Sequence, residues 1–218
     1  MNPVSKFRFL ALLIVVVVGD VSITNLLAEF LRPPRAPLAG NAPIPDQLSS
    51  AELVSAIAPF RSDLRAERAL MLAGQALKSQ APGESEREQA AQNAVRSALN
   101  IGPHDSRMWL VLALLEAKSR PVDPRLAGSF KMSYLTGPNR ADLIPARLEA
   151  VTSGSALSDP DLNELARSDV RAILTHFPDQ RQALVRDYAG ASQIGKMFLD
   201  ASVRTTDPNF VDTLQSAK

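Results

Sequence analysis

The sequence has no cysteine, and among its 218 residues it has only two histidines and one tryptophan. Without cysteine there are no disulfide bonds, thiolate nucleophiles, cysteine-ligated zinc sites or iron–sulfur clusters. Two histidines leave most metal sites without ligands, and an aromatic content of 5% is too low for base-stacking platforms. Basic residues exceed acidic residues by only one, 24 against 23, so no overall positive charge indicates nucleic-acid binding. We therefore expect no metal, no cofactor and no nucleic-acid partner.

Motifs that carry catalysis are also missing. The sequence contains no GxGxxG, HExxH or GxSxG pattern. Residues 190–196 have the spacing of a phosphate-binding loop, but Met197 stands where that loop has the hydroxyl that holds Mg²⁺. His104 and His176 are expected in turns or at helix ends, and Glu88 in a solvated first helical turn. We therefore predict a protein that is not an enzyme.

The N-terminal region holds the longest apolar run. Residues 9–19 carry no charge and follow Lys6 and Arg8. Extended to residue 31, the run reaches the roughly 20 residues that a membrane-spanning helix needs. Burying Asp20 in the bilayer would cost roughly 2.5–3.5 kcal/mol, which the surrounding apolar residues offset. The sequence thus predicts a tail at residues 1–8 and a transmembrane signal anchor at residues 9–31.

Two other interpretations of this region stay open. Residues 9–18 also fit the apolar region of a cleaved signal peptide, with Val17 and Gly19 small enough for the −3 and −1 positions of its cleavage site. A buried helix is the third possibility. The positive charges before the run favour a cytoplasmic N-terminus, although Arg32 and Arg35 follow close behind it. The expected location is a bacterial cytoplasmic (inner) membrane, crossed once, with the C-terminal domain in the periplasm.

After this region the chain changes character at a proline-rich linker. Residues 32–48 contain five prolines, which remove backbone donors and disfavour both helix and sheet. From residue 49 onward strand patterns are almost absent, and Asp-Pro and Gly-Pro pairs mark helix starts and ends. The predicted helices cover residues 49–58, 61–79, 84–100, 105–118, 124–135, 142–152, 160–176, 180–200 and 208–215.

A short pattern recurs along these helices. Residues 97–103 and 132–138 both end in Gly-Pro, 35 residues apart, and residues 172–178 end in Phe-Pro 40 residues later. Intervals near 34 residues are typical of stacked helix pairs, in which each hairpin buries its apolar face against its neighbour.

The first unit carries the most regular arrangement of apolar residues. Its positions are Leu70, Ala73, Gly74 and Leu77 in one helix and Ala91, Val95, Ala98 and Pro103 in the next. Trp109 opens a second unit that ends at Gly137 and Pro138, and Pro178 ends a third. Over residues 60–180 the chain therefore resembles the tetratricopeptide repeat family. The resemblance implies a short α-solenoid of stacked antiparallel helix pairs. Together with the helix signals it predicts an all-α fold, with the helical domain over residues 49–200 and a tail with a short helix at residues 201–218.

Basic and polar residues surround the second predicted turn. They are Lys131, Tyr134, Asn139, Arg140 and Arg147. Stacked hairpins present a concave face, and Arg and Tyr are frequent anchors at binding surfaces. We predict that these residues line a groove for an acidic peptide or polymer and so contact a partner, with a solvated face and ordinary ion pairs as the alternative.

The combination of a single-pass anchor and a helical body also resembles small envelope proteins of α-proteobacteria, some of them associated with exopolysaccharide synthesis. The function predicted is a membrane-anchored scaffold or adaptor for protein–protein interaction in the cell envelope, linked to exopolysaccharide synthesis or export. One alternative is an enzyme of unrecognised type that acts on envelope polymers. The other is a soluble periplasmic binding protein released by signal-peptide cleavage.

Overall fold

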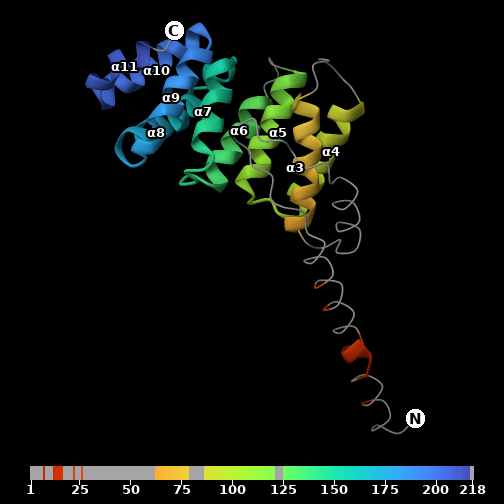
Figure 1. Ribbon diagram of the computed structural model, residues 1–218. Helices are drawn as coiled ribbons and strands as arrows, with labels where there is room; N and C mark the ends of the chain where they lie inside the picture. The colour runs from red at the N-terminus through yellow and green to blue at the C-terminus, as the bar shows by residue number, and fades with distance from the viewer. Residues whose placement is uncertain are drawn as a thin grey trace.

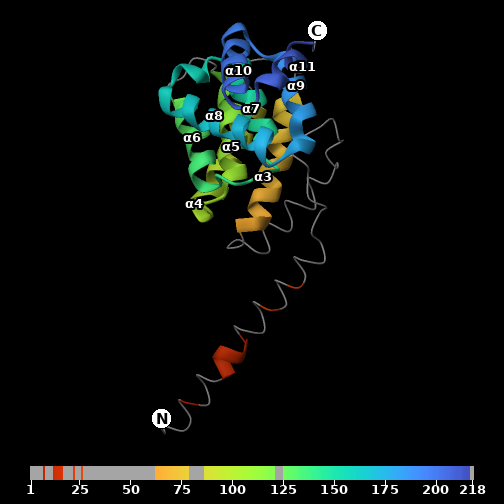
Figure 2. The ribbon, with the colours of Figure 1, turned by 90° about the vertical axis from the view of Figure 1, so that its left-hand side faces the viewer.

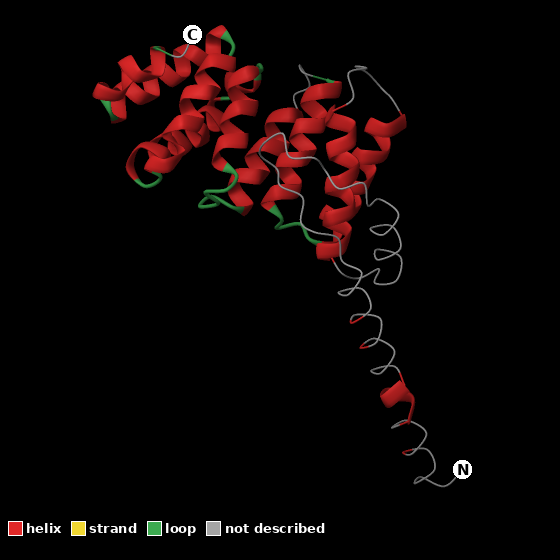
Figure 3. Ribbon diagram, in the orientation of Figure 1, coloured by secondary structure: helices red, strands yellow, loops and turns green. Residues whose placement is uncertain are grey.

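The computed structural model describes residues 62–78, 86–120 and 125–216, together with residues 7, 12–16, 22 and 26. Within these residues every regular element is a helix and none is a strand, which confirms the all-α class (Figure 3). The α-helices are α3 (Ser62–Lys78), α4 (Glu86–Ile101), α5 (Ser106–Ser119), α6 (Arg125–Thr136), α7 (Ile144–Ser153), α8 (Pro160–Thr175), α9 (Arg181–Gly190), α10 (Gln193–Thr206) and α11 (Val211–Gln215). Three short 3₁₀ helices, η1 (Ala156–Ser158), η2 (Pro178–Gln180) and η3 (Pro208–Phe210), lie between them.

Neighbouring helices pack against one another from α3 and α4 at one end to α10 and α11 at the other (Figure 1). Helix α3 packs on α4, and α5 packs on both α4 and α6. Further contacts join helices two apart in the chain, namely α3 with α5, α7 with α9, and α8 with α10. Figure 2 shows the same helices from the side, with α5 in the middle of the group.

Two apolar cores meet at α5. One is formed by α3, α4 and α5, and the other runs from α5 to α11. Helix α5 serves both because it is apolar nearly all round: Met108 and Leu112 lie in the first core, and Leu110 and Ala113 lie in the second. A helix without a polar face is expected to be buried on several sides.

Helix starts follow the Asp-Pro prediction in one described case and depart from it in another. The Asp159 carboxylate accepts a hydrogen bond from the Leu162 amide at 3.0 Å, and Pro160 is the first residue of α8. Asp207, by contrast, makes no side-chain cap, and its carboxylate lies 3.1 Å from Arg181. The predicted helix at residues 49–58 and the Asp-Pro pair at residues 123–124 lie outside the described residues.

The single helix predicted over residues 180–200 is wrong, because the chain forms α9 and α10 with a break between them. Ser192 makes the break: its hydroxyl accepts the Gly195 amide at 3.1 Å and so caps α10. Helix α10 then continues past residue 200 to Thr206, and both Val203 and Leu214 are fully buried. The packed helices therefore extend beyond the boundary that the sequence predicted at residue 200.

Gly137 follows the last residue of α6, where the sequence predicts a helix end. Its backbone does not adopt the left-handed conformation expected of a glycine after a helix. A Cβ atom there would lie 2.6 Å from the Ser106 Cβ, so glycine allows the close approach of the α6 end to α5. Pro138 follows it on the surface.

The other residues predicted to shape the repeats occupy ordinary packing positions. Ala98 is buried in the first core, and Gly74 lies within α3. Trp109 packs partly on that core and donates its indole N–H to the Pro103 carbonyl at 2.8 Å. Pro178 is exposed and begins η2.

One acidic residue expected in solvent lies inside the molecule. Glu88 is 1% exposed, and Lys118 of α5 lies 3.4 Å from its carboxylate. The Ser119 hydroxyl lies within 3.3 Å of the same group. The prediction of a solvated first turn is wrong at this position, because α5 packs over it.

The predicted membrane anchor falls mostly outside the described residues. Of residues 9–31, only residues 12–16, 22 and 26 are described, and residues 12–16 are helical with side chains between 50% and 70% exposed. In the part of the chain that the structure describes, no helix has the length and apolar character needed to cross a membrane. The anchor therefore stays a prediction.

Candidate functional site

Two of the five residues predicted to bind a partner lie in the core. Arg147 is 0% exposed and Tyr134 is 2% exposed. The structure brings them together, with the guanidinium 4.6 Å from the centre of the tyrosine ring. Neither side chain is available to a partner in this conformation, which differs from the surface role that the sequence suggested.

Arg147 satisfies the end of helix α6 from its position in α7. Its Nε donates to the Ser133 hydroxyl at 3.1 Å, and its Nη2 donates to the Gly137 carbonyl at 2.9 Å. The last carbonyls of a helix have no partner within the helix, so a buried helix end needs such donors. The arginine therefore joins α6 to α7.

Asp169 of α8 completes a buried charged group with Arg147 and Tyr134, referred to below as the Arg147 cluster. Burial raises the pKa of Asp169 to about 7, against the opposing effects of the Arg147 charge and the Tyr134 hydroxyl. Burial and the nearby Asp169 also raise the pKa of Tyr134, and burial lowers the pKa of Arg147. One polar atom of each side chain, Tyr134 Oη, Arg147 Nη1 and Asp169 Oδ2, is buried without a hydrogen-bond partner.

The remaining three predicted residues are on or near the surface. The Lys131 ammonium lies 3.0 Å from Asp159 and 3.4 Å from Asp161. Arg140 forms a two-pronged pair with Asp142 at 2.7 and 2.8 Å. Asn139 is exposed. Exposed ion pairs of this kind contribute little to stability, so a partner carboxylate could replace them at small cost.

Asn139 borders a hollow that the sequence did not single out, the α8 groove. Its volume is about 520 Å³, within the range of natural ligand pockets. One wall is the turn between α6 and α7, and the other is the last two turns of α8 with the segment that follows. The lining residues are Pro138, Asn139, Ile144, Ser168, Arg171, Ala172, Thr175, His176 and Phe177.

The two walls of the α8 groove are tied together beside it. The Gln180 amide of η2 donates to the Ala141 carbonyl of the α6–α7 turn at 2.9 Å. His176 is the C-cap residue of α8, as its position before Phe177 suggested, and its Nδ1 lies 2.6 Å from the Thr175 hydroxyl. The α6–α7 turn and the segment after α8 border the groove, and the Gln180–Ala141 hydrogen bond holds these two segments together.

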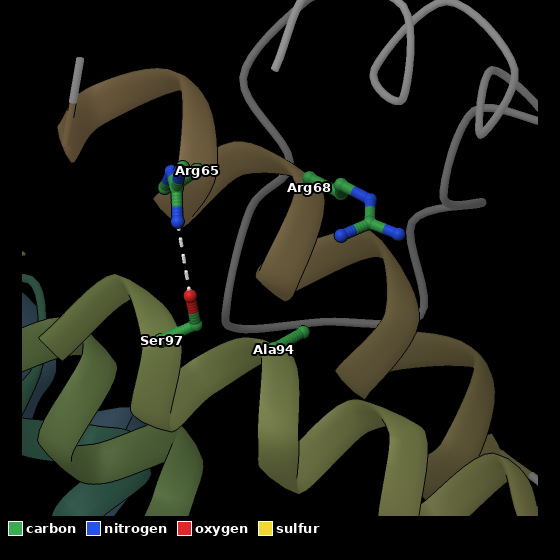
Figure 4. A pocket seen from close by; sticks show the side chains of 4 residues that line it. All are labelled: Arg65, Arg68, Ala94 and Ser97. Atoms are coloured by element: carbon green, nitrogen blue, oxygen red, sulfur yellow. Dashed lines mark hydrogen bonds between the residues drawn. The ribbon is translucent and has the colours of Figure 1, made fainter. Parts of the chain in front are cut away.

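A second, smaller hollow lies between α3 and α4 (Figure 4). It measures about 170 Å³ and is lined by Arg65, Arg68, Ala94 and Ser97. Arg65 reaches across it and donates to the Ser97 hydroxyl at 3.1 Å. Its size suits a few waters or a small anion better than a segment of protein.

No known protein family, curated protein or solved structure matches the chain. Among the described residues, no three acidic or histidine side chains lie together as metal ligands would. Asp169 and Asp187, whose carboxyl groups are the most perturbed, line neither hollow. The α8 groove is therefore the strongest candidate for a functional surface in the described chain.

The sequence alone does not reveal this groove, because the lining residues of its two walls are 24 to 39 residues apart in the chain. The sequence places Pro138 and Asn139 in a turn with basic surroundings, but it does not indicate that Arg171 lies beside them. The available signal was the spacing of Ser168, Arg171 and Thr175, which lie on one face of a helix. Their polarity alone indicated only a solvated face.

Asp187 of α9 offers a test of electrostatics that is independent of the groove. It is 8% exposed with Oδ2 unpartnered, and burial together with nearby Glu149 raises its pKa from 3.8 to about 7. The folded chain therefore binds this proton more tightly than the unfolded chain, so this carboxyl destabilises the fold increasingly as the pH rises from about 4 to 7. We expect Asp187→Asn to stabilise the protein by about 1–2 kcal/mol at pH 8.

Urea unfolding at pH 8 and pH 5 measures this effect. The advantage of Asp187→Asn should shrink at pH 5, where the native carboxyl is already protonated in the folded state. Asp179→Asn, at an exposed position of η2, is the control and should change stability little at either pH. A destabilised Asp187→Asn variant at pH 8 would mean that the carboxylate has a stabilising partner.

Proposed function

We propose that the protein is a non-enzymatic scaffold, anchored once in a bacterial inner membrane, that holds protein partners on the periplasmic side. The α8 groove carries this proposal. It joins an apolar lining to cationic and amide side chains, and it lies on a helical framework in which no described group of side chains resembles a catalytic site. Mixed apolar and polar hollows of this kind are typical of binding surfaces.

The helical framework supports the scaffold role. Contacts between helices two apart, such as α3 with α5 and α8 with α10, are what stacked helix pairs would make. We propose that the helices form a short solenoid similar to tetratricopeptide repeats. Such arrays commonly present extended binding surfaces.

Exposed apolar side chains support both anchoring and partner binding. Residues 12–16 are a run of five apolar residues in helical conformation, and all of them are at least 50% exposed. Within the packed helices, Leu135, Ile194 and Met197 are more than 60% exposed. Ile194 and Met197 are three residues apart on α10 and so lie on one face.

Anchoring would make the scaffold act by apposition. A partner bound to a membrane-fixed domain has a high effective concentration toward other membrane components, without any chemical step. A role in exopolysaccharide synthesis or export is the process that we propose for it. The alternative of an envelope enzyme gains no support from the described side chains. A released periplasmic binding protein would use the same groove, and the fractionation below distinguishes it from the anchored scaffold.

Fractionation of cells that make the full chain tests the anchor. We expect the intact chain in the membrane fraction and resistant to carbonate washing, with the mass of the full sequence. The double substitution Ile14→Asp/Val16→Asp should move it to the soluble fraction, because each acidic residue costs roughly 2.5–3.5 kcal/mol in a spanning helix. Leu135→Asp makes the same change at an exposed position of α6 and should leave the chain in the membrane.

A shortened mature chain in the soluble fraction would favour the signal-peptide alternative. Partner binding is tested by photo-crosslinking in intact cells, with a crosslinking amino acid placed at Asn139 or at Ile194. A discrete adduct at either position supports the scaffold. The absence of adducts at both positions would overturn it.

A further inference from the structure

We infer that the α8 groove binds a short acidic peptide segment that inserts an apolar side chain between the α6–α7 turn and α8. This inference rests on the proposed scaffold function and names the chemistry of the partner. It differs from the sequence-based expectation, which placed the binding residues around Arg140 and Arg147.

The charge of the groove selects an acidic occupant. Arg171 and His176 are the titratable residues of the lining, and the lining contains no carboxylate. Arg171 is exposed, and no described carboxylate lies within ion-pair distance of it. Neighbouring cations are paired already, as Arg167 is with Glu164 and Arg181 is with Asp207. An acidic partner residue would therefore meet an uncompensated positive charge at this position.

The rest of the lining fits an apolar side chain and an extended backbone. The half-buried Ala172 and Phe177 contribute apolar surface to the groove, and the buried Ile144 lies behind them. Ser168 and Thr175 stand on the same face of α8 as Arg171. Their hydroxyls donate to the Leu165 and Arg171 carbonyls of α8 at 2.6 and 2.8 Å, so toward a peptide they can accept hydrogen bonds from N–H groups. The Asn139 amide can both donate to and accept from peptide groups. A volume of about 520 Å³ accommodates a few side chains and no folded domain.

The groove is preformed, which reduces the entropic cost of binding. The Gln180–Ala141 hydrogen bond fixes its walls relative to each other, and the Arg147 cluster joins α6, α7 and α8 beneath the turn. A preorganised site loses less conformational freedom when a ligand binds.

Selection of a random 12-residue peptide library displayed on phage, with the purified full-length chain as target, tests the inference. We expect the enriched peptides to carry a net negative charge next to at least one large apolar residue. The dissociation constant of an enriched peptide, measured by fluorescence anisotropy, should rise at least about 10-fold for Arg171→Glu and less for Arg171→Ala. Reversing one charge that contacts the ligand costs at least this much in comparable interfaces.

Arg204→Glu is the matched control, since Arg204 is also an exposed arginine near the end of a helix and away from the groove. It should change the dissociation constant less than 2-fold. Enrichment of basic or uncharged peptides, no enrichment at all, or equal effects of the two reversals would overturn the inference. The scaffold proposal would still stand in each case if crosslinking at Ile194 gives an adduct, so the two proposals fail separately.

Discussion

Replacing Arg147 by methionine should destabilise the folded chain by about 2–4 kcal/mol at pH 8, because the buried Asp169 carboxyl loses the positive charge that favours its ionised form. The same change also removes the donors that Ser133 and Gly137 use at the end of α6. Methionine retains most of the side-chain volume, so the loss would come from charge and hydrogen bonds and not from a cavity. Urea unfolding followed by the helical circular-dichroism signal measures it.

Arg140→Met is the matched control. Both arginines were predicted from the sequence to bind a partner, but Arg140 is half exposed and paired with Asp142 only two residues away. We expect its replacement to cost less than about 1 kcal/mol. Equal losses for the two variants would contradict the assignment of Arg147 to the core.

A double substitution shows whether charge compensation is the cause. Asp169→Leu removes the buried carboxyl group that loses its nearby positive charge when Arg147 is replaced. In the Arg147→Met/Asp169→Leu variant we expect part of the lost stability to return, so that the two single effects add up to more than the double effect. Strict additivity would mean that the two residues act independently.

Replacing Gly195 by alanine should destabilise the chain by at least about 2 kcal/mol, because a Cβ at this position would overlap the backbone of Thr152. The clash involves the Thr152 carbonyl, and its carbonyl carbon would lie at 2.8 Å. Backbone atoms cannot move aside as a flexible side chain would, so α10 would have to shift away from the end of α7. Thermal and urea unfolding both report the loss.

Gly128→Ala is the control for this second substitution. Gly128 lies in the middle of α6, and a Cβ there meets no atom within 4 Å. Alanine in an open helical position stabilises by about 0.5–1 kcal/mol. We therefore expect the two glycine-to-alanine substitutions to change the free energy of unfolding in opposite directions. Stabilisation by both would show that α7 and α10 do not approach closely at Gly195.

The contact at Gly195 also explains the glycine spacing that looked like a phosphate-binding loop. Gly190 ends α9, and Gly195 lies against α7, while Ser192 between them donates through both its amide and its hydroxyl to the Thr152 carbonyl. The two glycines thus belong to a break between helices and to a close crossing. The sequence showed the spacing but not the neighbouring helix that requires it.

The sequence alone determined the helical class and most helix limits. Apolar residues at helical spacing, Asp159 before Pro160, and Gly-Pro pairs are local signals, and local hydrogen bonding and backbone sterics are enough to interpret them. The same signals failed between residues 180 and 200, where Ser192 gains its capping role together with a bond to Thr152, 40 residues away.

Only the tertiary structure decided which polar residues face solvent. The sequence around an arginine does not show whether its side chain is exposed or buried. Arg140 and Arg171 are on the surface, whereas Arg147 is in the core. The difference arises because the buried end of α6 and the carboxylate of Asp169 come from other helices, and together they offset the cost of removing one guanidinium from water. Desolvation depends on all the elements that surround a side chain, and this information is not contained in its sequence neighbours.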